Sequence, residues 1–491
     1  MSARRRLRAT HRLAFLGAGA ALVTATAACG GDDDSPDADR AATTSTTTTE
    51  PAAVASATTT TSTTTTTTTT TTNSTTTTAT TTADDGWKEG AATACAAYGA
   101  ELGATPGPEV SVGEYVAFWR DLRDRLPWLD ELDLPEDLRN PPTDVPALMR
   151  AADDHLADAE AAVAAGDDAA ADRSILRYDS LLEHTAALVT VAGADCGDPV
   201  RAANASLIVP VPNASQVTVG FGSVWVSQSS FTTVVRVDPE SGELLATIDV
   251  GDAPFKAQPA DGRMIVRGVD SYVAVDPTSN TVVATLPKSQ VGPSANRSWA
   301  IDGAMWVCDG QRVHRYDPAT FEPTGTTIEL GIDCGQVYAT TELVIAWVYD
   351  DDAGESGIAA AAFIDPTTDE LLATTPLPAD VTVPIVLDDV VFFPANLGGQ
   401  NVVVDRGTWA VTATPAYGRQ VGGSEMTYDG QFIYLIAEGT DVLVVDAESL
   451  EVTRTIEPLT IVARLNALTH TPGALWVAAG DSGILQRFDT P

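Results

Sequence analysis

The sequence predicts a multidomain chain in which an all-β seven-bladed propeller follows a small all-α helical bundle and a disordered threonine-rich linker. Seven copies of one phrase, an apolar strand leading into an aspartate and a polar turn, fill the last part of the 491 residues. Successive aspartates lie between 38 residues (Asp238 to Asp276) and 48 residues (Asp317 to Asp365) apart, which matches one four-stranded blade. A segment with apolar residues at helical spacing precedes the repeats, and a threonine tract precedes this helical segment. The seven aspartates are Asp238, Asp276, Asp317, Asp365, Asp405, Asp446 and Asp489.

Residues 1–28 have the pattern of an export signal. A basic start with five arginines leads into the apolar run 13–28, which is too short and too rich in small residues for a membrane span. The run ends in TAACGG at 26–31, which resembles a bacterial lipobox, with Thr26 where Leu, Val or Ile is usual. The resemblance implies cleavage before Cys29 and attachment of lipid to that cysteine. A plain secretory signal is the alternative.

Residues 29–86 are predicted to be a lipidated start followed by an extended stalk. The segment is mostly threonine, with an unbroken run over 63–72. It has almost no large apolar side chain to bury, so burial cannot offset the entropy lost on ordering. Threonine-rich stalks in secreted proteins are often O-glycosylated, which would stiffen this one.

The net charge argues against a nucleic-acid partner, and the cysteines indicate the compartment in which the protein folds. Lys and Arg number 28 against 67 Asp and Glu, a formal charge of −39, so we expect no nucleic-acid partner. Four cysteines besides Cys29 allow three pairings. Because Cys95 and Cys196 bracket the helical segment while Cys308 and Cys334 lie within one repeat, we predict disulfides within these two pairs. Disulfides indicate an oxidising compartment, and no spacing indicates a zinc or redox motif.

Residues 87–197 are predicted to form a four-helix bundle that the first disulfide staples. A short first helix is expected over 95–102, a second around Trp119, a third from about Thr143 and a fourth after Gly166. The aromatic cluster around Trp119 is interpreted as core in preference to a ligand groove. His155 and His184 are expected to have solvated or capping roles in preference to holding a metal. The aromatic cluster comprises Tyr115, Phe118, Trp119 and Trp128.

Residues 204–491 are predicted to be the propeller. An aromatic or large apolar strand precedes each aspartate, and we expect its aromatic residue to pack between blades. The Asp-Pro pairs should close the turn between the third and fourth strands of their blades, since aspartate caps the turn through its side chain and proline presets the backbone angle. The last repeat ends after its third strand, while a spare strand at 206–209 precedes the first repeat. Pairing of these two segments would close the ring and protect both edges.

The first repeat, GFGSVWVS at 220–227 with RVDPESGELLATI at 236–248, resembles the YVTN and streptogramin-lyase-like propeller superfamily. The resemblance covers roughly residues 204–491 and is strongest in repeats one, three and six, while repeats four and five are degenerate. The lipobox implies a bacterial lipoprotein, and the Ala-, Asp- and Thr-rich style of the chain suggests an actinobacterial one. Most relatives with this repeat have no known reaction, so the resemblance concerns the fold.

The resemblance to the lyases also implies what an enzyme would need, namely a histidine base and acidic metal ligands around the ring axis. His470 is expected to end an inner strand near the channel and is the one catalytic candidate, whereas His314 is expected on a third strand away from the axis. The inner-strand phrases of the lyases are absent, because FKA at 255–257 and SWA at 298–300 replace them. Asp350, Asp352 and Glu355 are candidate calcium ligands, but a solvated turn is the simpler interpretation.

These observations favour a binding protein over an enzyme, without a cofactor. The expected location is the outer face of the cytoplasmic membrane, where a lipid anchor would hold the chain. The propeller is interpreted as a binding or scaffold module for a protein, a glycan or a cell-wall polymer. A metal-dependent lyase or hydrolase acting on an exported small molecule is the alternative. In a third hypothesis the helical bundle is the sensor and the propeller its scaffold.

Overall fold

In the computed structural model the described residues are 110–125, 145–191, 205–291, 298–301, 303–349, 358–378, 381–395, 400–419, 421–458, 465–480 and 482–490. The expected signal peptide, stalk and first helix lie outside these ranges. So do Cys29, Cys95 and Cys196, and the candidate calcium ligands Asp350, Asp352 and Glu355. Within the described ranges, no helix is long and apolar enough to span a membrane.

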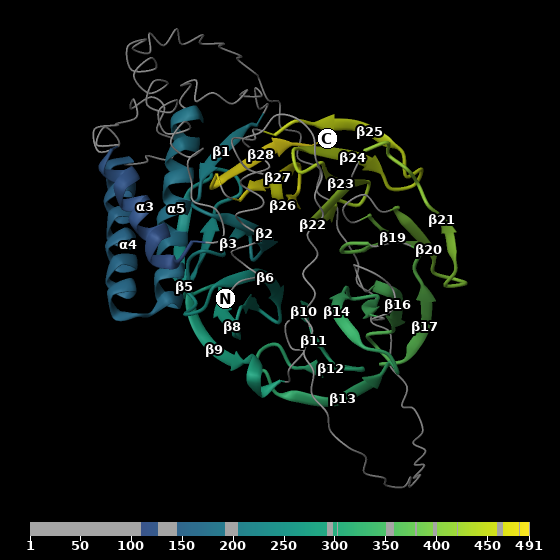
Figure 1. Ribbon diagram of the computed structural model, residues 1–491. Coiled ribbons are helices and arrows are strands. Elements are labelled where there is room, and N and C mark those ends of the chain that lie inside the picture. Colours follow the sequence, from purple (N-terminus) through teal and green to yellow (C-terminus); the bar gives the residue numbers. More distant parts are fainter. Residues whose placement is uncertain are drawn as a thin grey trace, which may run out of the picture. The chain divides into compact units, whose positions relative to one another are not determined.

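Seven antiparallel sheets of four strands each follow the helices and are arranged as the blades of a propeller, which confirms the predicted fold class (Figure 1). Blade one comprises β2 (Ala214–Gly220), β3 (Ser223–Gln228), β4 (Thr233–Val237) and β5 (Leu244–Asp249). Blade two comprises β6 (Pro254–Ala260), β7 (Arg263–Gly268), β8 (Ser271–Asp276) and β9 (Thr281–Pro287), with the short 3₁₀ helix η3 (Lys288–Gln290) after it. Blade three comprises β10 (Ser298–Ile301), β11 (Ala304–Asp309), β12 (Arg312–Tyr316) and β13 (Pro323–Glu329).

The remaining blades follow the same order. Blade four comprises β14 (Cys334–Ala339), β15 (Val344–Tyr349), β16 (Ile358–Ile364) and β17 (Leu371–Pro376). Blade five comprises β18 (Ile385–Val386), β19 (Val390–Phe393), β20 (Val402–Asp405) and β21 (Val411–Ala413). Blade six comprises β22 (Val421–Tyr428), β23 (Phe432–Ala437), β24 (Asp441–Asp446) and β25 (Val452–Ile456). Blade seven comprises β26 (Leu465–Thr471), β27 (Ala474–Ala479), β28 (Ile484–Asp489) and β1 (Leu207–Pro210).

The ring closes as the sequence predicts. Strand β1, which precedes the first repeat, pairs antiparallel with β28 as the fourth strand of blade seven. The register runs from Leu207 opposite Arg487 to Pro210 opposite Ile484. Because the first and last strands of the propeller share one sheet, their pairing holds the two ends of the ring together.

The aspartate of the repeat closes the turn between the third and fourth strands, also as predicted. Asp238 Oδ1 accepts hydrogen bonds from the backbone N–H groups of Glu240 and Ser241, at 3.0 and 2.8 Å. The chain then passes through Gly242 at a φ of 74°, and Gly242 donates its N–H to the Asp238 carbonyl. The same carboxylate-to-N–H bonds recur at Asp276, Asp317, Asp365, Asp405 and Asp446.

Seven apolar clusters hold neighbouring blades together. Each joins residues of two consecutive blades, and the second-strand aromatics lie inside them as the sequence predicts. Trp225, Trp306 and Trp476 are completely buried. Each buried tryptophan removes about 150–250 Å² from water, so these clusters stabilise the order of the blades as well as their packing. The second-strand aromatics are Trp225, Trp306, Trp347, Phe392, Tyr434 and Trp476.

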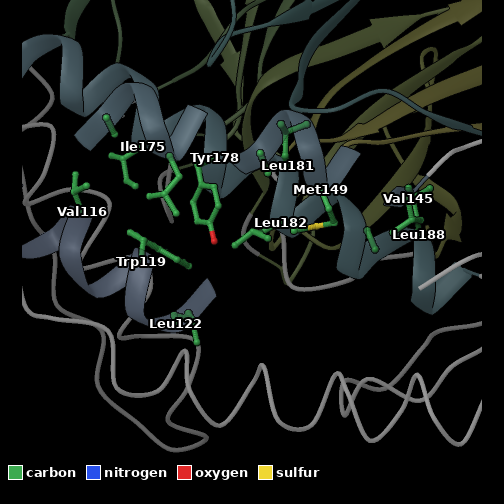
Figure 2. Packing of buried hydrophobic residues seen from close by; sticks show 14 of the residues in the cluster. Val116, Trp119, Leu122, Val145, Met149, Ile175, Tyr178, Leu181, Leu182 and Leu188 are labelled. Atoms are coloured by element: carbon green, nitrogen blue, oxygen red, sulfur yellow. The ribbon is translucent and has the colours of Figure 1, made fainter. Parts of the chain in front are cut away.

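Helices α3 (Val112–Asp124), α4 (Val145–Ala165) and α5 (Asp168–Val191) pack around an apolar cluster of their own. At its centre the rings of Trp119 and Tyr178 meet edge to face, with centroids 5.5 Å apart (Figure 2). Tyr115 and Phe118 make further edge contacts with Trp119, so the core interpretation is confirmed for these three aromatics. Trp128, the fourth member, lies outside the described residues.

The helical cluster continues into the propeller. Ile484 of β28 belongs to it, and Ile208 of β1 packs against it. His184 of α5 is only 1% exposed, and its Nδ1 lies 3.2 Å from the Ser482 carbonyl oxygen. The expectation of a solvated or capping role is therefore wrong for His184, because the turn before β28 covers that face of α5. His155 is half-buried, with its ring 6.3 Å from that of Phe231.

Candidate functional site

A cavity of about 420 Å³ opens among the seven inner strands, the first strand of each blade. Its volume lies within the range of about 300–1,000 Å³ that is usual for small-molecule sites. Every blade contributes to the wall, so the cavity lies on the axis of the ring. The lining residues are Val217, Thr218, Lys256, Gln258, Pro259, Trp299, Ala300, Ile301, Tyr338, Thr340, Val383, Pro384, Ile385, Val386, Met426, Thr427, Tyr428, Leu468 and Thr469.

Lys256 is the one charged side chain among the described residues of this wall. It lies on β6 opposite Arg267 of β7 and is only 6% exposed. Its Nζ lies 4.1 Å from the centroid of the Trp299 ring on the next blade. A cation at this distance is attracted to the negative face of the indole, which offsets part of the cost of taking the ammonium out of water.

Trp299 also contacts the blade on its other side. Its ring centroid lies 4.5 Å from that of Tyr338 on β14, and the two planes are inclined by 54°. Lys256, Trp299 and Tyr338 therefore form a continuous row across blades two, three and four. The row gives one side of the cavity a cation followed by two aromatic rings.

Gln258 lies two residues after Lys256, so both side chains point to the same face of β6. Its Oε1 accepts the backbone N–H of Ala300 at 3.1 Å, which fixes the amide group between blades two and three. The side chain is 6% exposed, and its Nε2 has no hydrogen-bond partner among the described residues. A buried donor without a partner is unusual in folded proteins, so this amide is a candidate for contact with a ligand.

His470, the catalytic candidate, lies on inner strand β26 as the sequence predicts. Its Nδ1 is 2.8 Å from the hydroxyl of Thr427, which lines the cavity, although His470 itself does not. Burial lowers the pKa of His470, and the nearby Asp429 carboxylate opposes this shift. The Asp429 carboxylate accepts hydrogen bonds from Tyr434 and from two backbone N–H groups. The imidazole therefore belongs to a polar network behind the wall.

His314 lies on third strand β12, away from the inner strands, as expected. Its Nδ1 is 3.1 Å from the Thr327 hydroxyl, and its Nε2 is 3.6 Å from Asp309. In the described part of the chain, no three His, Cys, Asp or Glu side chains gather as a metal site would require. The predicted disulfide between Cys308 and Cys334 is confirmed and joins β11 of blade three to β14 of blade four.

Sequence reasoning did not identify the row of Lys256, Trp299 and Tyr338. In the sequence, the segments that carry Lys256 and Trp299 were informative only because they differ from the inner-strand phrases of the lyases. One signal was available, because the chain has only three lysines and one of them falls on a predicted inner strand. A rare cation at an inner-strand position is a reason to examine the axis.

No protein-family model and no curated protein matches this chain. Solved structures resemble it at low identity. Hydrazine synthase from Kuenenia stuttgartiensis is 12% identical, with a TM-score of 0.45 over 58% of this chain and 98% of that one. BamB from Moraxella catarrhalis is 15% identical, with a TM-score of 0.39 over 56% of this chain and 84% of that one. The Cps50 (Swd1) propeller domain from Myceliophteria thermophila is 7% identical, with a TM-score of 0.45 over 58% and 100%.

Proposed function

We propose that this chain is a lipid-anchored extracytoplasmic protein whose propeller binds a protein, glycan or cell-wall ligand at its axial cavity. The observation that carries the proposal is the cavity wall, to which all seven inner strands contribute. A rigid ring with a hollow at its axis and loops at its faces is compatible with a binding or scaffold module.

The lining supports binding over catalysis. A cluster of histidines and carboxylates on the inner strands would have favoured a metal-dependent lyase or hydrolase. The described lining residues are instead apolar, aromatic and hydroxyl-bearing, with one amide and one lysine. Such a wall can orient a ligand, and its described residues include neither the histidine base nor the acidic metal ligands that a lyase of this type would need.

The start of the chain supports the anchored location. The basic segment, the apolar run over 13–28 and Cys29 follow the order of a bacterial lipoprotein signal. The disulfide between Cys308 and Cys334 is in keeping with an oxidising compartment outside the cytoplasm. The resemblance of the repeat to the YVTN and streptogramin-lyase-like superfamily supports our proposal that the propeller belongs to it and that the chain is an actinobacterial lipoprotein.

The anchor is tested by growing the host with an alkyne-bearing palmitate and measuring label on the purified full-length protein. We expect label on the wild type and on Cys308→Ala, which keeps Cys29, but none on Cys29→Ala. Equal labelling of Cys29→Ala would refute the anchor at this residue.

Binding is tested by cross-linking full-length protein in the envelope, solubilising it and identifying what copurifies. A cavity variant, Trp299→Ala with Tyr338→Ala, is compared with the wild type and with Val283→Ala. Val283 is 48% exposed on outer strand β9 and serves as the control. We expect one component to be enriched by the wild type and the control and lost by the cavity variant. Enrichment that the cavity variant retains would exclude the axis as the binding site.

A further inference from the structure

One inner-strand position recurs in all seven blades and lines the axial cavity. In blade one this position is Thr218, which pairs with Trp225 of the second strand; Trp225 in turn pairs with Arg236, two residues before the repeat aspartate. The same two steps of strand pairing lead to one residue in each of the other blades. We call these seven residues, all of which line the cavity, the axial ring. They are Thr218, Gln258, Trp299, Tyr338, Ile385, Thr427 and Thr469.

The axial ring has an aromatic side and a hydroxyl side. Trp299 and Tyr338 belong to the neighbouring blades three and four, and their ring centroids lie 4.5 Å apart. Thr427, Thr469 and Thr218 belong to the consecutive blades six, seven and one. In a closed ring of seven, blade seven lies opposite the junction of blades three and four. The three threonines therefore lie across the cavity from the two aromatic residues, and Figure 1 shows β26 and β2 across the centre from β10 and β14.

The two sides are accessible and uncharged. Their five residues are partly exposed, whereas Gln258 and Ile385 are buried. The Thr427 hydroxyl is 2.8 Å from His470 Nδ1, and a hydroxyl can donate and accept at once, so it can still bond to a ligand. No member of the axial ring is charged, and burial of an ion without an opposite charge is costly, so the ring suits an uncharged ligand. Lys256, whose ammonium already lies against the Trp299 ring, is assigned no ionic role.

We propose that the axial cavity binds a neutral sugar ring. A pyranose has the same two-sided character as the axial ring, because its C–H groups form an apolar face and its hydroxyl groups project from its edge. The apolar face packs against Trp299 and Tyr338, as apolar groups do on aromatic rings. The hydroxyl groups reach the threonines on the other side, where each partner can donate or accept a hydrogen bond. This inference rests on the proposed function, because it specifies the ligand class for the same cavity.

The experiment is saturation-transfer difference NMR with the full-length protein in dodecylphosphocholine micelles, whose headgroup contains no sugar. The probes are the methyl glycosides of glucose, galactose, mannose and N-acetylglucosamine, together with the anionic methyl glucuronide, each also measured with empty micelles. We expect protein-dependent saturation of at least one neutral glycoside, strongest at its ring C–H protons, and tighter binding of it than of the glucuronide when the signal is titrated. A glucuronide that binds as tightly as the best neutral probe would overturn the assignment to a neutral sugar.

Variants locate the binding. Trp299→Leu should weaken binding of the neutral glycoside about tenfold, because the sugar loses an aromatic surface. Thr218→Val with Thr469→Val should also weaken it about tenfold, because hydroxyl partners are lost while the side chains keep their branched shape. The matched control is Thr247→Val with Thr455→Val, since both threonines are exposed on outer strands, β5 and β25. Thermal unfolding verifies the fold of each variant, and unchanged binding in the folded tryptophan or threonine variant would overturn the proposal.

The outcomes separate this inference from the function on which it rests. If none of the five probes binds while the cavity variant still abolishes envelope capture, the sugar assignment is wrong and the binding function stands. If envelope capture does not depend on the cavity and no probe binds, both are wrong. Binding of a neutral glycoside that depends on the axial ring supports the inference whatever the envelope experiment gives.

Discussion

His184 should make the stability of this protein depend on pH. It lies on α5, buried against the turn before β28, and burial lowers the pKa of its imidazole to about 4, with hydrogen bonds to the backbone of Ser482 and Gly483 opposing the shift. In the unfolded chain its pKa is about 6.5. Below that value the unfolded chain takes up a proton that the folded protein excludes, so stability falls as the pH falls.

The size of the effect follows from these two pKa values. Between pH 7 and pH 5 the free energy of unfolding should decrease by about 2 kcal/mol through His184 alone. The ceiling, approached near pH 4, is about 3 kcal/mol. The substitution His184→Gln removes the titration while keeping an amide that can donate to the Ser482 carbonyl.

The assay is urea unfolding of wild type and His184→Gln at pH 7, 6 and 5, followed by tryptophan fluorescence. His155 and His470 also titrate with lowered pKa values, but both are present in the two proteins, so the difference isolates His184. We expect the wild type to lose about 2 kcal/mol more than the variant between pH 7 and pH 5. Parallel pH profiles would refute the claim that His184 is buried and neutral in the folded protein.

Three further predictions concern stability and are measured by the same urea unfolding at pH 7. Replacing both Cys308 and Cys334 by alanine should cost about 3 kcal/mol, because their disulfide closes a loop with a sequence separation of 26 residues. Gly483→Ala should cost about 2 kcal/mol more than Gly473→Ala, because both glycines have positive φ but only at Gly483 would a Cβ meet neighbouring atoms. Arg123→Met should cost about 2 kcal/mol, since this buried guanidinium donates two hydrogen bonds to one aspartate. Losses below about 0.5 kcal/mol in any of these would contradict the contact concerned.

The propeller could be predicted in detail because its information is local and repeated. Each aspartate turn fixes the connection between a third and a fourth strand, and the spacing of the turns leaves room for one blade. Ring closure could be predicted by counting strands. The sequence has one extra strand, β1, before the first repeat, and the last repeat has only three strands. Even blade five, where β18 has two residues and β21 three, keeps the order of the others.

The contact between helices and propeller could not be predicted in this way. Gly483 and Ile484 have the ordinary pattern of a turn followed by a buried strand, and nothing in it shows that a helix covers them. Conversely, His184 lies in a helical stretch of mixed apolar and polar residues. This pattern does not show which side of the helix packs against the propeller. Such packing depends on surfaces brought together from sequence positions about 300 apart.

The residues that line the cavity could not be predicted from the sequence for a related reason. Lys256, Trp299 and Tyr338 are separated by about one repeat each, and their side chains become neighbours only when the blades are stacked around the ring. A lysine within a strand ordinarily faces solvent. Only the closed ring turns one inner-strand lysine into a buried cation beside an aromatic ring.

Ring closure connects the helices to the cavity. The helical cluster includes Ile484 of β28 and contacts Ile208 of β1, the two strands whose pairing holds the ends of the ring together. Opening that pairing would allow blades seven and one to separate, and their inner strands carry Thr469 and Thr218 of the cavity wall. A ligand that needs the whole wall binds only the closed ring and stabilises it in return. Contacts of the helices with blade seven favour the same state. We therefore expect the helical segment to strengthen the proposed binding at the axis without touching the ligand.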